Sequence, residues 1–415
     1  MPALVMFSFC SYLWASRGTG EAEMATVRLR RTQQDAKRSG PVVPPPADVE
    51  RRRPELRTYA TVDTERRRGR GVNGNPDGRF EPIQREAAFD GWDLAEEPAP
   101  IRTEVTLEKP RTIIARNDSP DISFDRSINP YRGCEHGCVY CFARPSHAYQ
   151  GLSPGLDFET KLFAKPNAAE LLRRELAAPG YKVDTMALGT NTDPYQPIEK
   201  QYRITRSVLE VLAETNHPVG IVTKSALVTR DIDILAPMAA RGLAKVAISV
   251  TTLDPKLARR MEPRAATPQK RLAAIRMLAE AGIPVSVLVA PVIPALNDHE
   301  IENILQACYA AGARQAGYVL LRLPHELKGL VRDWLAENYP DRMKHVLSLV
   351  EGTRDGKLYD SKWGQRQTGV GPYAWMIGRR FEKAAERLGF NRVRRELRTD
   401  LFRKPAKETA QLALF

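Results

Sequence analysis

The sequence predicts an α/β protein built on a parallel β-sheet of six strands. From residue 110 onward, short apolar runs alternate with longer stretches whose apolar residues recur at helical spacing. This alternation is typical of repeated βα units. A chain of 415 residues with 42% hydrophobic residues can also bury a large core. The six strands are expected at residues 122–128, 185–189, 219–223, 245–250, 284–290 and 316–323.

Five helices fit between these strands. Two of them, at 268–281 and 298–311, are each followed by a glycine, Gly282 or Gly312, as expected of a helix C-cap. The other three are expected at 167–178, 203–215 and 231–241. Right-handed crossovers between parallel strands produce either a doubly wound sheet or a partial barrel, and the pattern alone leaves both open.

Three cysteines, Cys134, Cys138 and Cys141, form one C-x3-C-x2-C run shortly after the first predicted strand. Three thiolates on a cubane iron-sulfur cluster leave one iron without a protein ligand, so that iron can bind another molecule. Zinc is the alternative, because His136 lies between the cysteines and Cys3His is a common zinc set. Zinc sites usually combine two separated ligand pairs, however, whereas these candidates crowd into eight residues.

The other two of the five cysteines, Cys10 and Cys308, are isolated in the sequence. An odd count without a disulfide framework favours a reducing, cytoplasmic setting. Cys308 shares helical spacing with Ile301, Ile304 and Leu305, so a buried core thiol is expected there. No apolar run reaches membrane-spanning length, and the apolar start lacks a basic region, so neither a membrane span nor a secretory signal is expected.

Residues 1–109 are rich in Arg, Pro, Gly and acidic residues. Such a composition buries too little apolar surface to offset the entropy of ordering, so this segment is predicted to be largely disordered. Met24 begins a polar stretch of the kind that is ordinary at a protein N-terminus. Residues 1–23 are therefore interpreted as the product of an upstream start codon, and the folded core is expected from residue 110.

The cysteine spacing, with the aromatic Tyr140 directly before the third cysteine, resembles the radical S-adenosylmethionine (radical SAM) superfamily. The resemblance implies a partial (β/α)6 barrel, here over residues 110–323, and a 4Fe-4S cluster on the three cysteines. It also implies that the open iron binds the amino and carboxylate groups of S-adenosylmethionine, which the reduced cluster cleaves to a 5'-deoxyadenosyl radical. An electron donor such as flavodoxin or ferredoxin is expected with it.

Several stretches within about residues 110–325 look like the branch related to spore photoproduct lyase. The lyase uses an additional cysteine to return a hydrogen atom to its substrate, and this chain has none between Cys141 and Cys308. The resemblance is therefore to the branch and not to the lyase itself. The stretches are Asn129-Pro-Tyr-Arg-Gly-Cys134, Asn191-Thr-Asp-Pro-Tyr195, Thr223-Lys-Ser225, Pro291-Val-Ile-Pro294 and Asn297-Asp298.

In such a barrel, ligands meet the C-terminal ends of the strands. The second predicted strand ends in a loop of exposed backbone and small polar side chains suited to an ammonium group. The loop stands where the superfamily binds the methionine amino group, although it lacks the common Gly-Gly-Glu form. Its predicted cofactor-binding residues are Gly189, Thr190, Asn191 and Thr192.

The ends of the later strands supply the remaining cofactor candidates. Lys224, after the third strand, can meet a carboxylate or be a solvated surface charge. Ser249 and Arg264 are similarly placed for ribose and carboxylate, and the backbone edge at Ala290 could hold adenine against Tyr140. No residue is assigned as a catalytic acid, base or hydrogen donor.

Residues 324–403 are predicted to form a helical, basic extension. Residues 376–410 contain eleven Lys or Arg against five Asp or Glu, and basic residues interleaved with aromatics suit a nucleic-acid surface. The alternative is a helix at 373–388 that caps the open barrel, with the aromatics in its core. The aromatics are Trp334, Tyr339, Tyr359, Trp363, Tyr373 and Trp375.

The chain ends in a polar tail, residues 404–415, whose last five residues are Gln411-Leu-Ala-Leu-Phe415. Two leucines and a phenylalanine at this spacing resemble the bacterial sliding-clamp-binding motif, a terminal docking peptide. The alternative is an apolar tail that tucks onto its own domain.

Taken together, these features predict a cytoplasmic bacterial radical SAM enzyme with a nucleic-acid substrate, with a damaged or modified DNA base favoured. Modification of tRNA, a peptide or a small metabolite is one alternative. A non-enzymatic, clamp-associated iron-sulfur protein is the other, and cleavage of S-adenosylmethionine would separate it from the enzymes.

Overall fold

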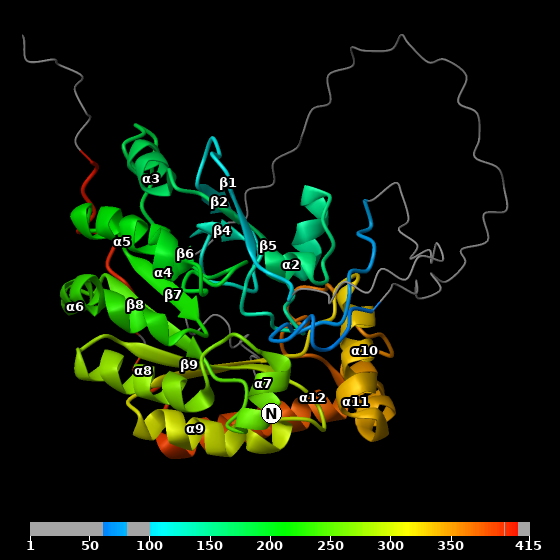
Figure 1. Cartoon of the computed structure of the whole chain (residues 1–415). Coiled ribbons are helices and arrows are strands. Elements are labelled where there is room, and N and C mark those ends of the chain that lie inside the picture. The colour runs from blue at the N-terminus through cyan, green and yellow to red at the C-terminus, as the bar shows by residue number, and fades with distance from the viewer. Residues whose placement is uncertain (1–60, 81–99, 394, 406–415) are drawn as a thin grey trace, which may run out of the picture. The chain divides into compact units, whose positions relative to one another are not determined.

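A computed structural model describes residues 61–80, 100–393 and 395–405. Its main element is a seven-stranded sheet of order β10-β9-β8-β7-β6-β3-β2, in which β2 is antiparallel to β3 and the other neighbours are parallel (Figure 1). The sheet does not close on itself, as expected of a partial barrel. Its strands are β2 (Ile114–Arg116), β3 (Arg126–Ile128), β6 (Met186–Leu188), β7 (Val219–Thr223), β8 (Ala244–Ser249), β9 (Val285–Val292) and β10 (Gln315–Leu320).

All six predicted parallel strands and all five predicted helices are present. The first strand is shorter than predicted, because residues 122–125 form a bend before β3. The helices lie between consecutive strands, as right-handed crossovers require. They are α3 (Ala168–Leu176), α5 (Ile204–Glu214), α6 (Ile232–Ala240), α8 (Pro268–Glu280) and α9 (Ile301–Ala310).

Shorter helices shape the loops at the C-terminal ends of the strands. Most of them follow a strand or the cysteine run, whereas α2 lies between η1 and β5. They are η1 (Arg144–Gln150), α2 (Asp157–Thr160), α4 (Glu199–Tyr202), η2 (Ala226–Asp231), α7 (Pro255–Met261) and η3 (Asp298–Glu300).

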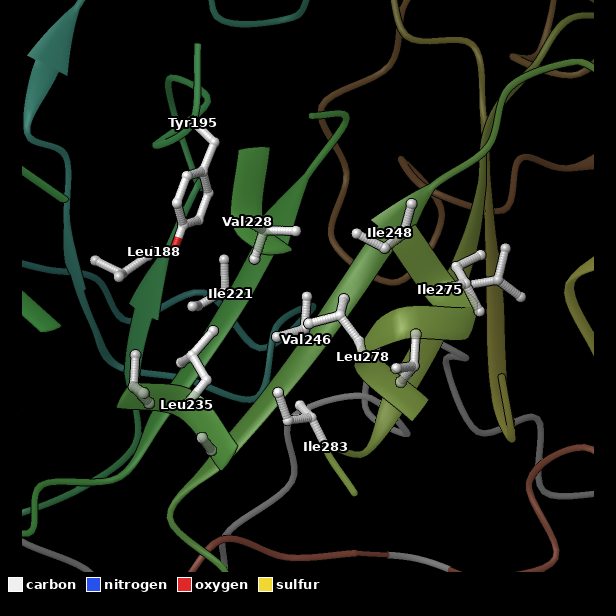
Figure 2. Close-up of a cluster of buried hydrophobic side chains, with 14 of the residues drawn as sticks. Leu188, Tyr195, Ile221, Val228, Leu235, Val246, Ile248, Ile275, Leu278 and Ile283 are labelled. Atoms are coloured by element: carbon white, nitrogen blue, oxygen red, sulfur yellow. The ribbon is translucent and has the colours of Figure 1, made fainter. Parts of the chain in front are cut away.

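The core lies between the sheet and its helices. Figure 2 shows Ile221 and Val246 of adjacent strands packed against Leu235 of α6 and Leu278 of α8. Every residue of β8 is buried, as expected where both faces of a parallel sheet are covered. Cys308 is fully buried in this core, as predicted.

A second sheet of three strands, order β1-β5-β4, lies beside the barrel. Its strands are β1 (Glu104–Leu107), β4 (Tyr131–Arg132) and β5 (Lys161–Ala164). Strand β1 pairs in parallel with β5 over its whole length. Since β4 ends at Arg132, this sheet fixes the start of the cysteine run.

The predicted disorder of residues 1–109 does not hold for the parts that the structure describes. Residues 61–76, named the N-terminal strap here, pack on the chain around α2: the Leu156 amide donates to the Gly74 carbonyl (3.1 Å), and Asn75 and Asp157 exchange two hydrogen bonds. Besides these backbone and polar contacts, Val72 of the strap is buried in a hydrophobic cluster with residues of α10 and α11. Residues 1–60 and 81–99, including the proposed start at Met24, lie outside the described residues.

The C-terminal extension bridges the two edges of the open sheet. It contains α10 (Leu327–Asn338), α11 (Pro340–Gly352) and α12 (Gly371–Leu388). The Leu320 amide at the end of β10 donates to the Gln367 carbonyl (2.8 Å), while the Gln367 side chain donates to the Asp121 carbonyl before β3 (3.3 Å). Arg366 also forms an ion pair with the Asp121 carboxylate. The extension thereby closes the gap that the strands leave.

The aromatic residues of the extension divide between its core and its surface. Trp334 is buried against Tyr339, and Tyr373 donates to Asp298 (2.6 Å). Trp363 and Trp375, in contrast, are exposed. Some of these aromatics therefore pack in the core of the extension, and others lie at its surface. No helix of the described residues is long and apolar enough to cross a membrane.

Candidate functional site: the cysteine loop and the strand ends of the barrel

The cysteine loop, residues 133–141, lies directly after β4 and is held by one buried glutamine. The Gln196 side chain accepts from the Glu135 amide (2.9 Å) and donates to the Gly133 carbonyl (3.2 Å). Gly133 has a φ of +71°, and a Cβ there would lie 2.9 Å from the Phe158 carbonyl oxygen. This turn therefore requires a residue without a side chain.

Arg144 and Glu159 form a buried ion pair under the loop. The Arg144 Nε donates to the Cys138 carbonyl (2.8 Å), and the Glu159 carboxylate accepts from the Gly71 amide of the strap (2.9 Å). A charge this deeply buried is tolerated only because its partners satisfy it. The pair thus ties the strap, α2 and the cysteine loop into one unit.

The three thiols suit a cluster better than a single metal ion. Among the residues that the structure describes, no three His, Cys, Asp or Glu side chains converge on one point. Ligands of a cubane bind different irons and need not converge on one point. Cys134 and Cys138 are buried and Cys141 is partly exposed. Burial, followed by neighbouring negative charge, raises the pKa of the Cys134 and Cys138 thiols, so thiolates there depend on the positive charge of bound iron.

The loop after β6 folds back on β3 through Asn129. The Asn129 Oδ1 accepts from the Asn191 amide (3.0 Å) and lies 3.4 Å from both the Thr192 amide and the Thr190 hydroxyl. The Thr192 hydroxyl donates to the Tyr131 carbonyl (3.1 Å). Gly189 has a φ of +87° and lies so close to the Val222 carbonyl that a Cβ would not fit. Much of the hydrogen bonding by this loop's amides and hydroxyls therefore holds the loop itself in place.

Lys224 and Tyr140, two of the predicted cofactor-binding residues, lie close together. The Lys224 Nζ lies 5.7 Å from the centroid of the Tyr140 ring, within the range of a cation–π contact. The Tyr140 hydroxyl is near Thr251 (3.3 Å) and donates to the buried carboxylate of Glu262, which also pairs with Arg271. No ion pair to the Lys224 ammonium is found among the described residues, so it can meet the carboxylate of a ligand.

Ser249 and Ala290 also meet at the ends of adjacent strands. The hydroxyls of Ser249 and Thr251 both donate to the Ala290 carbonyl, each at 3.1 Å. Asn297 then holds the following turn, since its side chain accepts from the Ile293 amide (2.6 Å) and donates to the Thr251 carbonyl (2.8 Å). The structure therefore groups Tyr140, Ser249 and Ala290 around one strand edge.

Arg264 lies elsewhere than the other candidates. Its guanidinium pairs with Glu135 (2.9 Å), and its amide donates to the His136 carbonyl (3.2 Å). It lines a separate cavity of about 480 Å³ with His136, Lys200 and Lys270. Arg264 thus braces the cysteine loop, and the structure does not place it with the predicted ribose contacts.

Sequence reasoning missed the buried polar residues that position the site. Asp193 accepts from the Lys224 amide (2.8 Å), the Thr223 hydroxyl (2.7 Å) and the Tyr195 amide (2.9 Å), and lies 3.4 Å from the His136 ring. Its place within the Asn-Thr-Asp-Pro-Tyr stretch was the available signal. Gln196 had no comparable signal, because its partners in the cysteine loop are distant in the chain. Glu262 joins the nearby Arg271 and Thr251 to the distant Tyr140, and no motif marks this set.

The site lies within the part of the chain that is similar to known proteins. The model of the radical SAM superfamily matches residues 128–308, which include the cysteine loop and the ends of the first five parallel strands. An uncharacterized protein of Mycobacterium tuberculosis strain H37Rv is 37% identical over 285 residues, covering 67% of this chain and 82% of the relative. The chain belongs to the radical SAM superfamily, and it is therefore an enzyme whose cofactors are a 4Fe-4S cluster and S-adenosylmethionine.

More distant similarities extend this comparison. A radical SAM Nalpha-GlyT isomerase of Pseudomonas phage M6 is 26% identical over 319 residues, covering 68% of this chain and 63% of the phage protein. A structure of spore photoproduct lyase complexed with dinucleoside spore photoproduct is 19% identical and covers 68% of this chain and 78% of the lyase, with a TM-score of 0.46.

Proposed function

We propose that this enzyme uses the 5'-deoxyadenosyl radical to modify a base in a nucleic acid, with DNA favoured. When bound, the reduced cluster supplies the electron that cleaves S-adenosylmethionine. In this proposal, Cys134, Cys138 and Cys141 hold the cluster, Lys224 meets the methionine carboxylate, and the strand edge at Ala290 receives adenine. An electron carrier such as flavodoxin or ferredoxin reduces the cluster, and the enzyme acts in the cytoplasm.

The observation that supports a nucleic-acid substrate is the exposed face of α12. Trp375, Arg379, Lys383 and Arg387 are four residues apart and all exposed, so they form one stripe along the helix. Trp375 is 68% exposed, although a large apolar side chain gains from burial. Cations at this spacing suit successive phosphates, and an exposed indole suits stacking on a base.

Recruitment by the bacterial sliding clamp is part of the proposal. It is supported by the terminal sequence Gln411-Leu-Ala-Leu-Phe415, which lies outside the described residues. A docked tail would raise the local concentration of the enzyme on newly copied DNA.

The test compares DNA binding by the parent and by a double variant, Arg379→Gln with Lys383→Gln. Fluorescence anisotropy across a salt series should show weaker binding and a salt slope smaller by about two, one per lost phosphate contact. The matched control, Lys256→Gln with Arg276→Gln, removes one exposed lysine and one exposed arginine from other helices and should change little.

The reaction itself is tested with the anaerobically loaded enzyme. Nucleosides of the treated DNA should contain a new or a lost modification by mass spectrometry, accompanied by 5'-deoxyadenosine. If the parent binds DNA no better than the double variant, and only tRNA, a peptide or a small metabolite stimulates cleavage of S-adenosylmethionine, the DNA proposal is wrong.

A further inference from the structure

Two arginines lie next to each other where the chain leaves β10, at the edge of the barrel that carries the cofactor residues. Arg354 is almost fully buried below this edge, and its Nη atoms donate only to backbone carbonyls, those of Gln365 (3.0 Å) and Leu321 (3.0 Å). Arg322 is two residues beyond the end of β10. Arg354 therefore contacts the backbone of Leu321, the residue directly before Arg322.

Neither arginine forms an ion pair with an acidic side chain among the described residues. Within the described part of the chain, Arg322 has no hydrogen bond or ion pair, and the Nε atoms of both Arg322 and Arg354 are buried without an acceptor. A buried donor without an acceptor is costly, and native proteins satisfy nearly all of them. Two such atoms in one place indicate that an acceptor from outside the chain belongs there.

The electrostatics agree with that conclusion. Burial, and then the neighbouring Arg322 guanidinium, lowers the pKa of Arg354 to about 10, although Tyr359 and Asp360 act in the opposite direction. Arg322 thus adds a second positive charge beside Arg354, and a bound anion would relieve the repulsion between the two. A phosphate offers several acceptor oxygens, and the planar guanidinium of arginine binds such a group well.

A flat apolar surface adjoins this cationic pair. The Arg322 guanidinium lies 5.1 Å from the centroid of the Phe142 ring, and Phe142 is 48% exposed. Phe142 directly follows Cys141, the third cysteine of the loop. An exposed ring beside a cation suits a nucleobase joined to a phosphate, since the base can stack on the ring while the phosphate meets the arginine.

A second aromatic pair continues this surface. The Arg79 guanidinium lies over the rings of Phe80 (5.0 Å) and Tyr149 (5.5 Å), and both rings are more than half exposed. Arg79 also approaches the Pro145 carbonyl (3.4 Å) and pairs with Glu326 (3.5 Å). Pro145 lies on η1, three residues after Phe142, and Glu326 lies four residues after Arg322. A strand bound at Arg322 would therefore meet further rings for its neighbouring bases.

We propose that Arg322, backed by Arg354, binds a phosphodiester of a single-stranded segment of the substrate, and that the adjoining base stacks on Phe142. The site deepens the proposed function, on which it rests, because it supplies the contacts that hold a nucleotide beside the cofactor pocket. A peptide carboxylate would need the two arginines but would not need the ring. The aromatic surface therefore favours the nucleotide.

The test measures binding of a fluorescein-labelled single-stranded DNA oligonucleotide by anisotropy over a salt series. Arg322→Gln should weaken binding about tenfold or more and reduce the salt slope by about one. Phe142→Ala should weaken binding at least about fivefold at an unchanged slope, since stacking carries no counterion release. The control Arg342→Gln makes the same charge change at an exposed position on α11 and should bind like the parent.

Iron content and far-UV circular dichroism should match the parent in all three variants, which shows that the fold and the cluster loop are retained. If the parent binds DNA and Arg322→Gln and Phe142→Ala bind it equally well, the site is wrong while the proposed function stands. A parent that binds no nucleic acid at any salt concentration overturns both. Loss of an acidic peptide's binding in Arg322→Gln, with DNA binding unchanged, overturns the nucleotide assignment.

Discussion

Gly71 of the N-terminal strap lies directly against Gly137 of the cysteine loop, and replacing it should disturb the cluster from outside the metal-binding motif. A Cβ at position 71 would lie 1.7 Å from the Gly137 carbonyl oxygen. Ordinary contacts of such atoms begin near 3.4 Å, so the two backbones must separate by about 1.7 Å. Because the Gly71 amide also donates to buried Glu159, the strap cannot move alone. Overpacking of this kind costs about 1–3 kcal/mol.

We therefore expect Gly71→Ala to lower the Tm by a few °C and to reduce the iron retained after anaerobic reconstitution. Gly180→Ala is the matched control, since a Cβ there meets nothing within 4 Å. The assays are thermal unfolding and iron and sulfide analysis. Full iron loading and an unchanged Tm in Gly71→Ala would refute the view that the strap positions the cysteine loop.

Four further changes test the site, the fold and the tail. Alanine at any of the three cysteines should abolish a content of about four irons and four sulfides per chain; one zinc per chain would contradict the cluster. Lys224→Ala should weaken binding of S-adenosylmethionine in calorimetry at unchanged iron content, and unchanged affinity would make this lysine a surface charge. Burial lowers the pKa of His217 to about 4, whereas in the unfolded chain it is near 6.5. The fold is therefore more stable above pH 6.5 than at pH 4 by about 3 kcal/mol, and this stability is lost as the pH falls between the two values. His217→Phe should flatten the dependence of the Tm on pH over that range, and a parallel curve would argue against it. Deleting residues 411–415 should abolish micromolar binding to the sliding clamp while sparing cleavage of S-adenosylmethionine, whereas retained binding would make the tail structural.

The periodic part of the fold could be predicted because burial imposes it. Strands such as β7 and β8 are rich in buried apolar residues, and helices such as α8 are followed by a glycine, so hydrophobic spacing locates them. The strap could not be found this way. Its contacts run through backbone atoms, Asn75, two arginines and the buried side chain of Val72. A composition rich in Arg and Gly predicts disorder, although tertiary contacts order this segment.

The candidate site was predictable only where one short stretch carries it. The cysteines and Lys224 follow strands directly, so their position at the barrel edge follows from topology. Arg264 follows α7 instead of a strand, and its partner is Glu135, more than a hundred residues earlier. Arg322 gave no signal in the sequence. Its distinguishing feature is a buried Nε atom without a hydrogen-bond acceptor, and this appears only once the chain is folded.

The bridge between Asp121 and Arg366 has a consequence for how the protein is made. The two residues are 245 positions apart, so the ribosome must add that much chain after Asp121 before the contact can form. At about 5–20 residues per second, this takes roughly 12–50 s. Throughout that interval the strands of the nascent barrel exist without the segment that joins their two edges. The lateral gap is thus closed late in synthesis, long after the three cysteines have left the ribosome.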